Sequence, residues 1–203
     1  TIKIKLNDFS IQNSSNIQNV ISTVQKCIYL THGSLTYLTK EQNYLFIRCV
    51  WGVPPFSFYD DSARSVSAGL MLQYVITSLG YQIGIGISTG ASFTGLCGVQ
   101  GNRKVLEVMG GKVLVSLLLM EEAVSAVDKN DSKGEIYIDK VTMKMIQKWY
   151  RCMYIGISSN KCTFDIYTPM YKENDFIPNV SDPFPFIRTH KYNSYNPKMN
   201  NPS

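Results

Sequence analysis

Apolar and polar positions along the chain predict one domain that mixes strands and helices. Residues 1–6 alternate between apolar and polar side chains, as a half-buried strand does, and apolar residues recur every three or four positions between residues 17 and 28, which is typical of an amphipathic helix. The same periodicities predict further strands at 34–39, 44–51, 104–108, 135–138, 151–158 and 163–169, and further helices at 63–79, 112–127 and 141–149. This order predicts an α+β domain with a mainly antiparallel sheet and helices packed on one face.

One strand-like stretch, GIGISTGASFTGLCG at residues 84–98, contains more glycine than a strand normally accepts. Glycine weakens a strand and leaves no side chain to pack. Repeated glycines therefore mark either a sharp turn or a place where something approaches the backbone closely. We interpret the stretch as two strands that turn at residues 89–91.

Composition sets the boundaries of the domain. The chain has 203 residues, of which 44% are hydrophobic and 17% charged, as is usual for a globular protein. Prolines scattered among asparagines and serines after residue 170 predict a linker or disordered tail at 171–203. The domain itself is therefore predicted to span residues 1–170.

The sequence also argues against membranes, secretion and nucleic acids. The longest apolar run, residues 113–120, is far too short to cross a bilayer, and we expect no signal peptide. Five cysteines without CxxC spacing predict reduced thiols in the cytoplasm rather than a zinc site or a disulfide framework. The net charge of +5 permits an anionic partner, but the aromatic residues and lysines are not interleaved as base stacking on a sheet requires.

A resemblance gives the glycine stretch a meaning. The segments GISTGASFTGLCG (86–98), NRKVLEVMGGKV (102–113) and LLLMEEA (117–123) resemble, in this order, the catalytic domain of class III nucleotidyl cyclases. Residues 33–66 resemble the elements that precede this motif, especially in the bicarbonate-responsive soluble adenylyl cyclases, and the resemblance covers residues 2–169. It implies a ferredoxin-like cyclase fold in which the glycine stretch is a tight hairpin at the interface between two such domains.

The resemblance also implies a mechanism that needs two domains. Two aspartates of one half hold two Mg²⁺ or Mn²⁺ ions, which activate the ribose 3′-hydroxyl of ATP for attack on the α-phosphorus and release of pyrophosphate. The other half supplies a lysine and an aspartate or threonine that read the base. It also supplies an asparagine and an arginine, on one helix, that orient the ribose and stabilise the charge of the transition state.

Most of these functional positions carry other residues in this chain. The helix positions of the asparagine and the arginine fall on Leu114 and Leu118, and the base-reading lysine falls on Tyr37. The metal-binding aspartate of the hairpin falls on residues 41–42, which are Glu and Gln, and the lysine that meets the triphosphate falls on Ile155. We therefore predict that this half has no catalytic residue. Its leucine-rich helix is predicted to make apolar contacts where the family has catalytic side chains.

Four residues remain as candidates for binding. Glu107 falls on the base-reading position otherwise taken by aspartate or threonine, and Arg103 and Lys112, before and after it, would meet phosphate. Asp8, at the end of the first strand, falls where the second metal-binding aspartate belongs. Simpler alternatives are a solvated strand glutamate, exposed loop cations and, for Asp8, a cap of the following helix or loop.

The sequence thus predicts a degenerate half of a soluble-type adenylyl cyclase that contributes to cyclic AMP synthesis from ATP. Its partner is a second cyclase domain, either another copy or a metal-carrying half, and that partner mainly holds the Mg²⁺ or Mn²⁺ ions. The alternative is a noncatalytic module for dimerisation or small-ligand regulation. The choice between ATP and GTP stays open at this stage.

Overall fold

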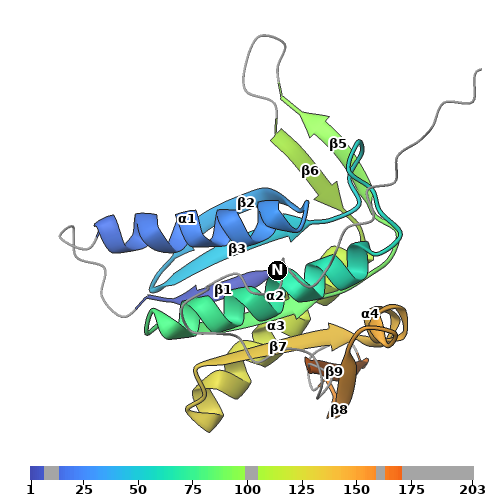
Figure 1. Cartoon of the computed structure of the whole chain (residues 1–203). Helices are drawn as coiled ribbons and strands as arrows, with labels where there is room; N and C mark the ends of the chain where they lie inside the picture. Colours follow the sequence, from blue (N-terminus) through green and yellow to red (C-terminus); the bar gives the residue numbers. More distant parts are fainter. Residues whose placement is uncertain (7–13, 99–104, 159–162, 171–203) are drawn as a thin grey trace, which may run out of the picture.

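A computed structural model describes residues 1–6, 14–98, 105–158 and 163–170, so the tail predicted at 171–203 lies outside the described residues. A seven-stranded sheet forms the centre of the molecule, and a two-stranded sheet projects from it (Figure 1). The strands are β1 (Ile2–Lys5), β2 (Ser34–Glu41), β3 (Tyr44–Val50), β4 (Gln82–Ile87), β5 (Phe93–Cys97), β6 (Val105–Met109), β7 (Gly134–Asp139), β8 (Arg151–Ile157) and β9 (Asp165–Met170). The helices are α1 (Ser14–Leu30), α2 (Asp61–Ser78), α3 (Gly111–Asn130) and α4 (Lys140–Ile146).

The sheet has the strand order β2-β3-β1-β4-β7-β9-β8. Its neighbouring strands pair antiparallel, except β4 and β7, which pair in parallel and are joined through the crossover that contains α3. The predicted α+β class with a mainly antiparallel sheet is confirmed, and each predicted element lies within a few residues of its observed bounds.

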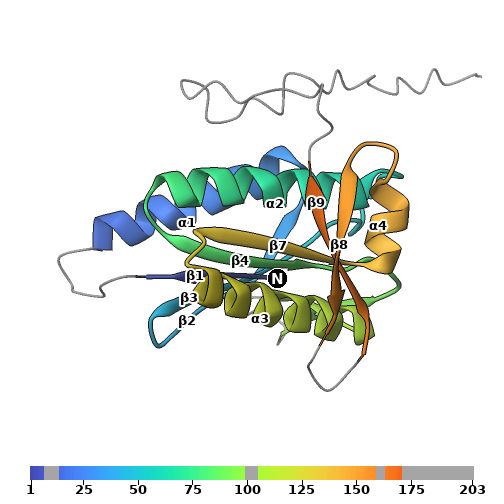
Figure 2. The same cartoon turned by 90° about the horizontal axis from the view of Figure 1, so that it is seen from below.

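The helices cover both faces of the sheet, so the prediction that they pack on one face is wrong. Helices α1 and α2 lie on one side of the central strands and α3 lies on the other (Figure 2). Strand β4 explains this arrangement because its side chains alternate between the faces. Ile83 and Ile85 belong to the core packed by α1 and α2, whereas Gly84 and Gly86 face α3.

The glycines of β4 are needed for the close approach of α3. A Cβ atom on Gly84 would lie 2.5 Å from Cγ2 of Val124, and one on Gly86 would overlap the carbonyl oxygen of Ser116 and the backbone nitrogen of Met120. Backbone atoms of a helix cannot yield as a flexible side chain can. Of the two interpretations of glycine in a strand, close approach is therefore the correct one here.

The predicted hairpin that turns at residues 89–91 does not form. Strand β5 pairs with β6, in the register Gly95 opposite Glu107, and not with β4. Strand β4 instead stays in the main sheet between β1 and β7.

Two apolar clusters hold the layers together. The larger one joins the sheet to α1 and α2, and its fully buried members include Ile4, Ile28, Ile47, Met71, Leu72 and Ile85. The smaller one joins α3 to β7 and β9 and is formed by Leu119, Ala123, Tyr137 and Ile166. Within the described residues, no helix is long and apolar enough to cross a membrane.

Candidate functional site

Helix α3 covers only part of its face of the sheet. Its contacts are mainly with β4 and β7, while β1 is tied to it by ion pairs from Lys3 to Glu121, at 3.0 Å, and from Lys5 to Asp128, at 2.9 Å. On the same face, beyond β1, the ring of Tyr37 on β2 packs edge-on against Phe46 of β3, with ring centres 5.9 Å apart. Tyr37 remains 44% exposed, so this part of the face is open in the single chain.

Apolar side chains are exposed where the resemblance places the polar residues of a cyclase. Leu114, on α3, is 52% exposed and Ile155, on β8, is 43% exposed. Leu118 is half-buried, whereas the next residue, Leu119, is fully buried in the smaller cluster. The outer side of α3 therefore presents leucine at the two positions for which the resemblance implies asparagine and arginine.

Glu107 lies on β6 and is half-buried. Gly95 is its partner across the two-stranded sheet, and a Cβ on that glycine would meet nothing within 4 Å. The strand that carries Glu107 therefore has free space next to it at Gly95. Arg103 and Asp8, the predicted phosphate and metal ligands, lie outside the described residues.

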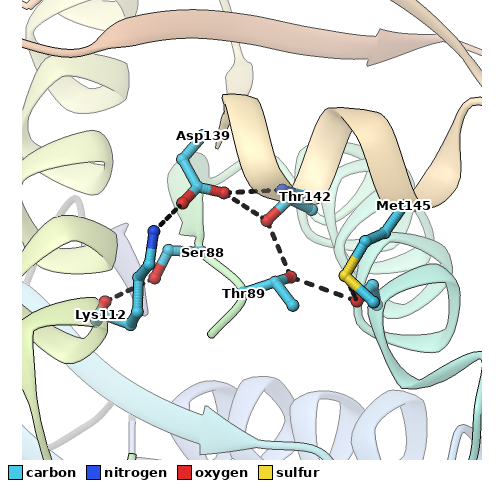
Figure 3. Close-up of polar contacts among 7 residues, drawn as sticks. Ser88, Thr89, Lys112, Asp139, Thr142 and Met145 are labelled. Atoms are coloured by element: carbon cyan, nitrogen blue, oxygen red, sulfur yellow. Dashed lines mark hydrogen bonds and ion pairs between the residues drawn. The ribbon is translucent and has the colours of Figure 1, made fainter. Parts of the chain in front are cut away.

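Lys112, in the first turn of α3, is bound within the domain. Its Nζ atom donates to Oδ2 of Asp139 at 2.7 Å, and the Asp139 side chain is 7% exposed while that of Lys112 is 33% exposed (Figure 3). The other carboxylate oxygen of Asp139 accepts from the backbone N–H and the hydroxyl of Thr142, at 2.9 and 2.6 Å, and so caps α4. Since Asp139 already compensates the charge of Lys112, a phosphate would have to compete with Asp139 to bind the ammonium group.

The ion pair continues into a chain of hydroxyl groups. The Thr142 hydroxyl already donates to Asp139, so the single proton of the Thr89 hydroxyl goes either to Thr142, at 2.9 Å, or to Ser62, at 3.2 Å (Figure 3). Ser62 in turn donates to the sulfur of Met145 at 3.4 Å. The network joins the start of α3, the end of β7, the start of α4 and the start of α2, so it fixes four elements relative to one another.

Sequence reasoning identified Lys112 but neither Asp139 nor Thr142. The letters DKVT at residues 139–142 contain a local signal, an aspartate at a strand end with threonine three residues later, which is typical of a helix N-cap. No local pattern predicts the ion pair, because Lys112 and Asp139 are 27 residues apart.

The described residues do not fit a two-metal site. Among them, no group of three or more His, Cys, Asp or Glu side chains lies close enough together to hold a metal ion. The hairpin position of the metal-binding aspartate holds Glu41 and Gln42, and Gln42 occupies the left-handed region with φ +52°.

Comparison with solved structures identifies the fold. The adenylyl cyclase CyaB from P. aeruginosa superposes with a TM-score of 0.66 and 15% identity, over 87% of this chain and 95% of that chain. The guanylate cyclase domain of RhGC from Catenaria anguillulae, in complex with GTP, gives 0.66 and 14% over 85% and 95%. The guanylyl cyclase Cya2 gives 0.61 and 17% over 87% and 93%. No protein-family model and no curated protein matches the sequence.

The class of the molecule is therefore an α+β domain with a seven-stranded, mainly antiparallel sheet covered by helices on both faces. More narrowly, this chain has the fold of the class III nucleotidyl cyclase catalytic domains, as the resemblance implied. Adenylyl and guanylyl cyclases match equally well, so the fold does not select the nucleotide.

Proposed function

We propose that this chain is the degenerate half of a two-domain adenylyl cyclase, which produces cyclic AMP from ATP in intracellular signal transduction. The observation that carries the proposal is the outer side of α3 in a cyclase fold, where Leu114 is 52% exposed and Leu118 half-buried. Leucine donates no hydrogen bond to a ribose or a phosphate. It does gain free energy when a partner domain covers it, roughly 1.5–3 kcal/mol for a whole side chain.

The partner is a second cyclase domain, either another copy of the chain or a metal-carrying half. Mg²⁺ or Mn²⁺ is held mainly by that partner, and Asp8 is the one ligand that this chain offers in the proposal. The exposed Tyr37 and Ile155 support the same partner-facing surface, since each replaces a lysine implied by the resemblance. Domain boundaries of 1–170, with a linker at 171–203, complete the proposed organisation.

ATP is the proposed nucleotide because of Glu107. A carboxylate accepts hydrogen bonds only, so it pairs with the exocyclic amino group of adenine and repels the carbonyl oxygen that guanine carries at the same position. Arg103 is the proposed phosphate contact. Lys112 joins it only when nucleotide competes with Asp139 for its ammonium group.

A cytoplasmic location is part of the proposal. Burial raises the pKa of the Cys27 and Cys49 thiols to about 12, so both stay protonated at neutral pH. Both cysteines are free thiols in the structure, and free thiols persist in the reducing cytoplasm.

The test is to measure cyclic AMP from ATP by the chain alone, by a metal-carrying half of a soluble-type cyclase alone, and by the two together. We expect no turnover from either half alone and slow turnover from the mixture, because the partner holds the metal ions but Leu114 and Leu118 stand at the asparagine and arginine positions. A Glu107→Ala variant should reduce the preference for ATP over GTP. A complex that forms without turnover would favour a noncatalytic dimerisation module. Turnover by the chain alone would contradict the degenerate assignment.

A further inference from the structure

A cavity of about 150 Å³ lies where β3 and β4 end and where α2 and α3 begin. Because a cavity needs only roughly 10–15 Å³ to hold one water, this one is ample for a tetrahedral ion of five heavy atoms. Glu107, Leu114 and Leu118 do not line it. The cavity is therefore separate from the positions proposed above for the base and for the partner domain, although Lys112, the second proposed phosphate contact, lines it.

Two long helices begin at this cavity. The first turn of α2, an 18-residue helix, contributes Asp61 and Ser62, and the first turn of α3, a 20-residue helix, contributes Lys112. Neither helix has a side-chain hydrogen bond from its N-cap residue. The first N–H groups of a helix carry partial positive charge, and the first turn of α3 contains no acidic residue, so the start of α3 favours a negative group in the cavity, whereas the start of α2 already carries Asp61.

Arg48 supplies the strongest sign of a missing ligand. Its Nε atom is buried and has no hydrogen-bond partner among the residues that the structure describes. The guanidinium carbon lies 5.6 Å from the ring centre of Tyr37, which restrains the group without accepting its in-plane N–H bonds. A buried donor without an acceptor is unfavourable, and an oxyanion is the acceptor that suits a guanidinium best.

Asp61 lacks a hydrogen-bond donor, whereas Arg48 lacks an acceptor. Its Oδ2 atom accepts from the backbone N–H of Phe58 at 2.8 Å, but Oδ1 is buried and, within the described part of the chain, lacks a donor. Burial raises the pKa of this carboxyl group. A ligand that presented only negative oxygens would repel Asp61, whereas a ligand with an O–H group would satisfy it.

We propose that this cavity binds a small oxyanion that carries an O–H group, with free hydrogen phosphate as the simplest example. The negative oxygens accept from Arg48 and from the first N–H groups of α3, and the P–OH group donates to Asp61. The hydroxyl of Ser62 donates only to the sulfur of Met145, a weak acceptor, and is available to turn towards the ion. Lys112 contributes little net charge because Asp139 pairs with it.

The test compares phosphate with sulfate on the full chain at pH 7 and equal ionic strength, by thermal unfolding and by titration calorimetry. The two ions have the same shape, but sulfate carries no proton at this pH. We expect saturable binding of phosphate, with a raised melting temperature, and sulfate binding weaker by about tenfold or more, because the wrong ion leaves Asp61 without a donor.

Variants assign the contacts. Arg48→Met is expected to weaken phosphate binding by about tenfold or more, whereas Lys144→Met, which removes an exposed cation of α4 outside the cavity, leaves it unchanged. Asp61→Asn supplies an amide donor, so it is expected to bring sulfate close to phosphate in affinity. Circular dichroism checks that each variant is folded.

Three results would overturn the proposal: no saturable phosphate binding by the folded wild-type chain, equal binding of sulfate, or full binding by a folded Arg48→Met variant. Phosphate NMR line broadening on the wild-type chain decides the first result even if a variant fails to fold. Cyclic AMP synthesis is not measured in this experiment, so its outcome and that of the two-domain cyclase test are independent.

Discussion

Replacing Leu118 with arginine tests which side of α3 faces outward. Leu118 is half-buried and outside the two core clusters, so the change removes about half of the roughly 1.5–3 kcal/mol that full burial of a leucine provides. The arginine stem can lie along the same apolar surface with its guanidinium in water, which recovers part of the loss. We expect the free energy of unfolding to fall by about 1 kcal/mol or less, as measured by urea denaturation of the isolated chain.

The neighbouring residue is the matched control. Leu119 is fully buried against Ala123 and Tyr137, so Leu119→Arg places an unpaired charge in the smaller cluster. That change should cost roughly 4 kcal/mol or more, a large part of the stability of a typical domain, and leave the chain mostly unfolded. Equal damage from both variants would show that Leu118 is a core residue and would refute its place at the arginine position of a cyclase.

Three further predictions follow from particular contacts. Gly86→Ala should prevent normal packing of α3 and lower the melting temperature sharply, because the new Cβ overlaps backbone atoms of that helix. The control is Gly95→Ala, whose Cβ meets nothing within 4 Å, and it should change the free energy of unfolding by roughly 0.5 kcal/mol or less in the same thermal assay. Asp139→Ala should cost about 2 kcal/mol in urea denaturation, since it removes the cap of α4 and the partner of a half-buried lysine that can turn towards water. Between pH 9 and about 12 the unfolded chain releases the thiol protons of Cys27 and Cys49, while the folded chain keeps them. The contribution of each thiol to the free energy of unfolding is therefore fully present below pH 9 and falls by about 1.4 kcal/mol per pH unit above it. A urea midpoint that does not change from pH 8 to 10.5 would contradict this prediction.

The periodic elements were predictable because their signals are local. A period of two identified strands such as residues 1–6, and three- and four-residue spacing identified the helix near residues 17–28, since each pattern reflects burial of one side of one element. The glycine stretch was harder. Glycine permits both a turn and a close approach, and only the position of α3, which begins 25 residues after Gly86, decides between the two.

The polar network around Asp139 could not be predicted from the sequence because its contacts are also not local. Lys112 was predicted to meet a phosphate from its place in a motif, and the motif contains no information about Asp139 on another strand. Neither Arg48 nor Asp61 was predicted to lack a hydrogen-bond partner, because single charged residues in a sequence are usually solvated. Their buried, unpartnered atoms become visible only when the folded chain is searched for missing hydrogen bonds.

Helix α3 connects the sequence to both proposals. Its inner side must be closely packed, because Gly84 and Gly86 bring β4 against the helix backbone without any side chain between them. Its outer side is not needed for that contact, yet it carries Leu114 in an exposed position. A helix that is apolar on both sides is stable in water only when both sides are covered. The inner side is covered by this chain, and in the proposed two-domain assembly the partner covers the exposed leucine. The start of the helix, held by Lys112 and Asp139, would then set the orientation of that surface.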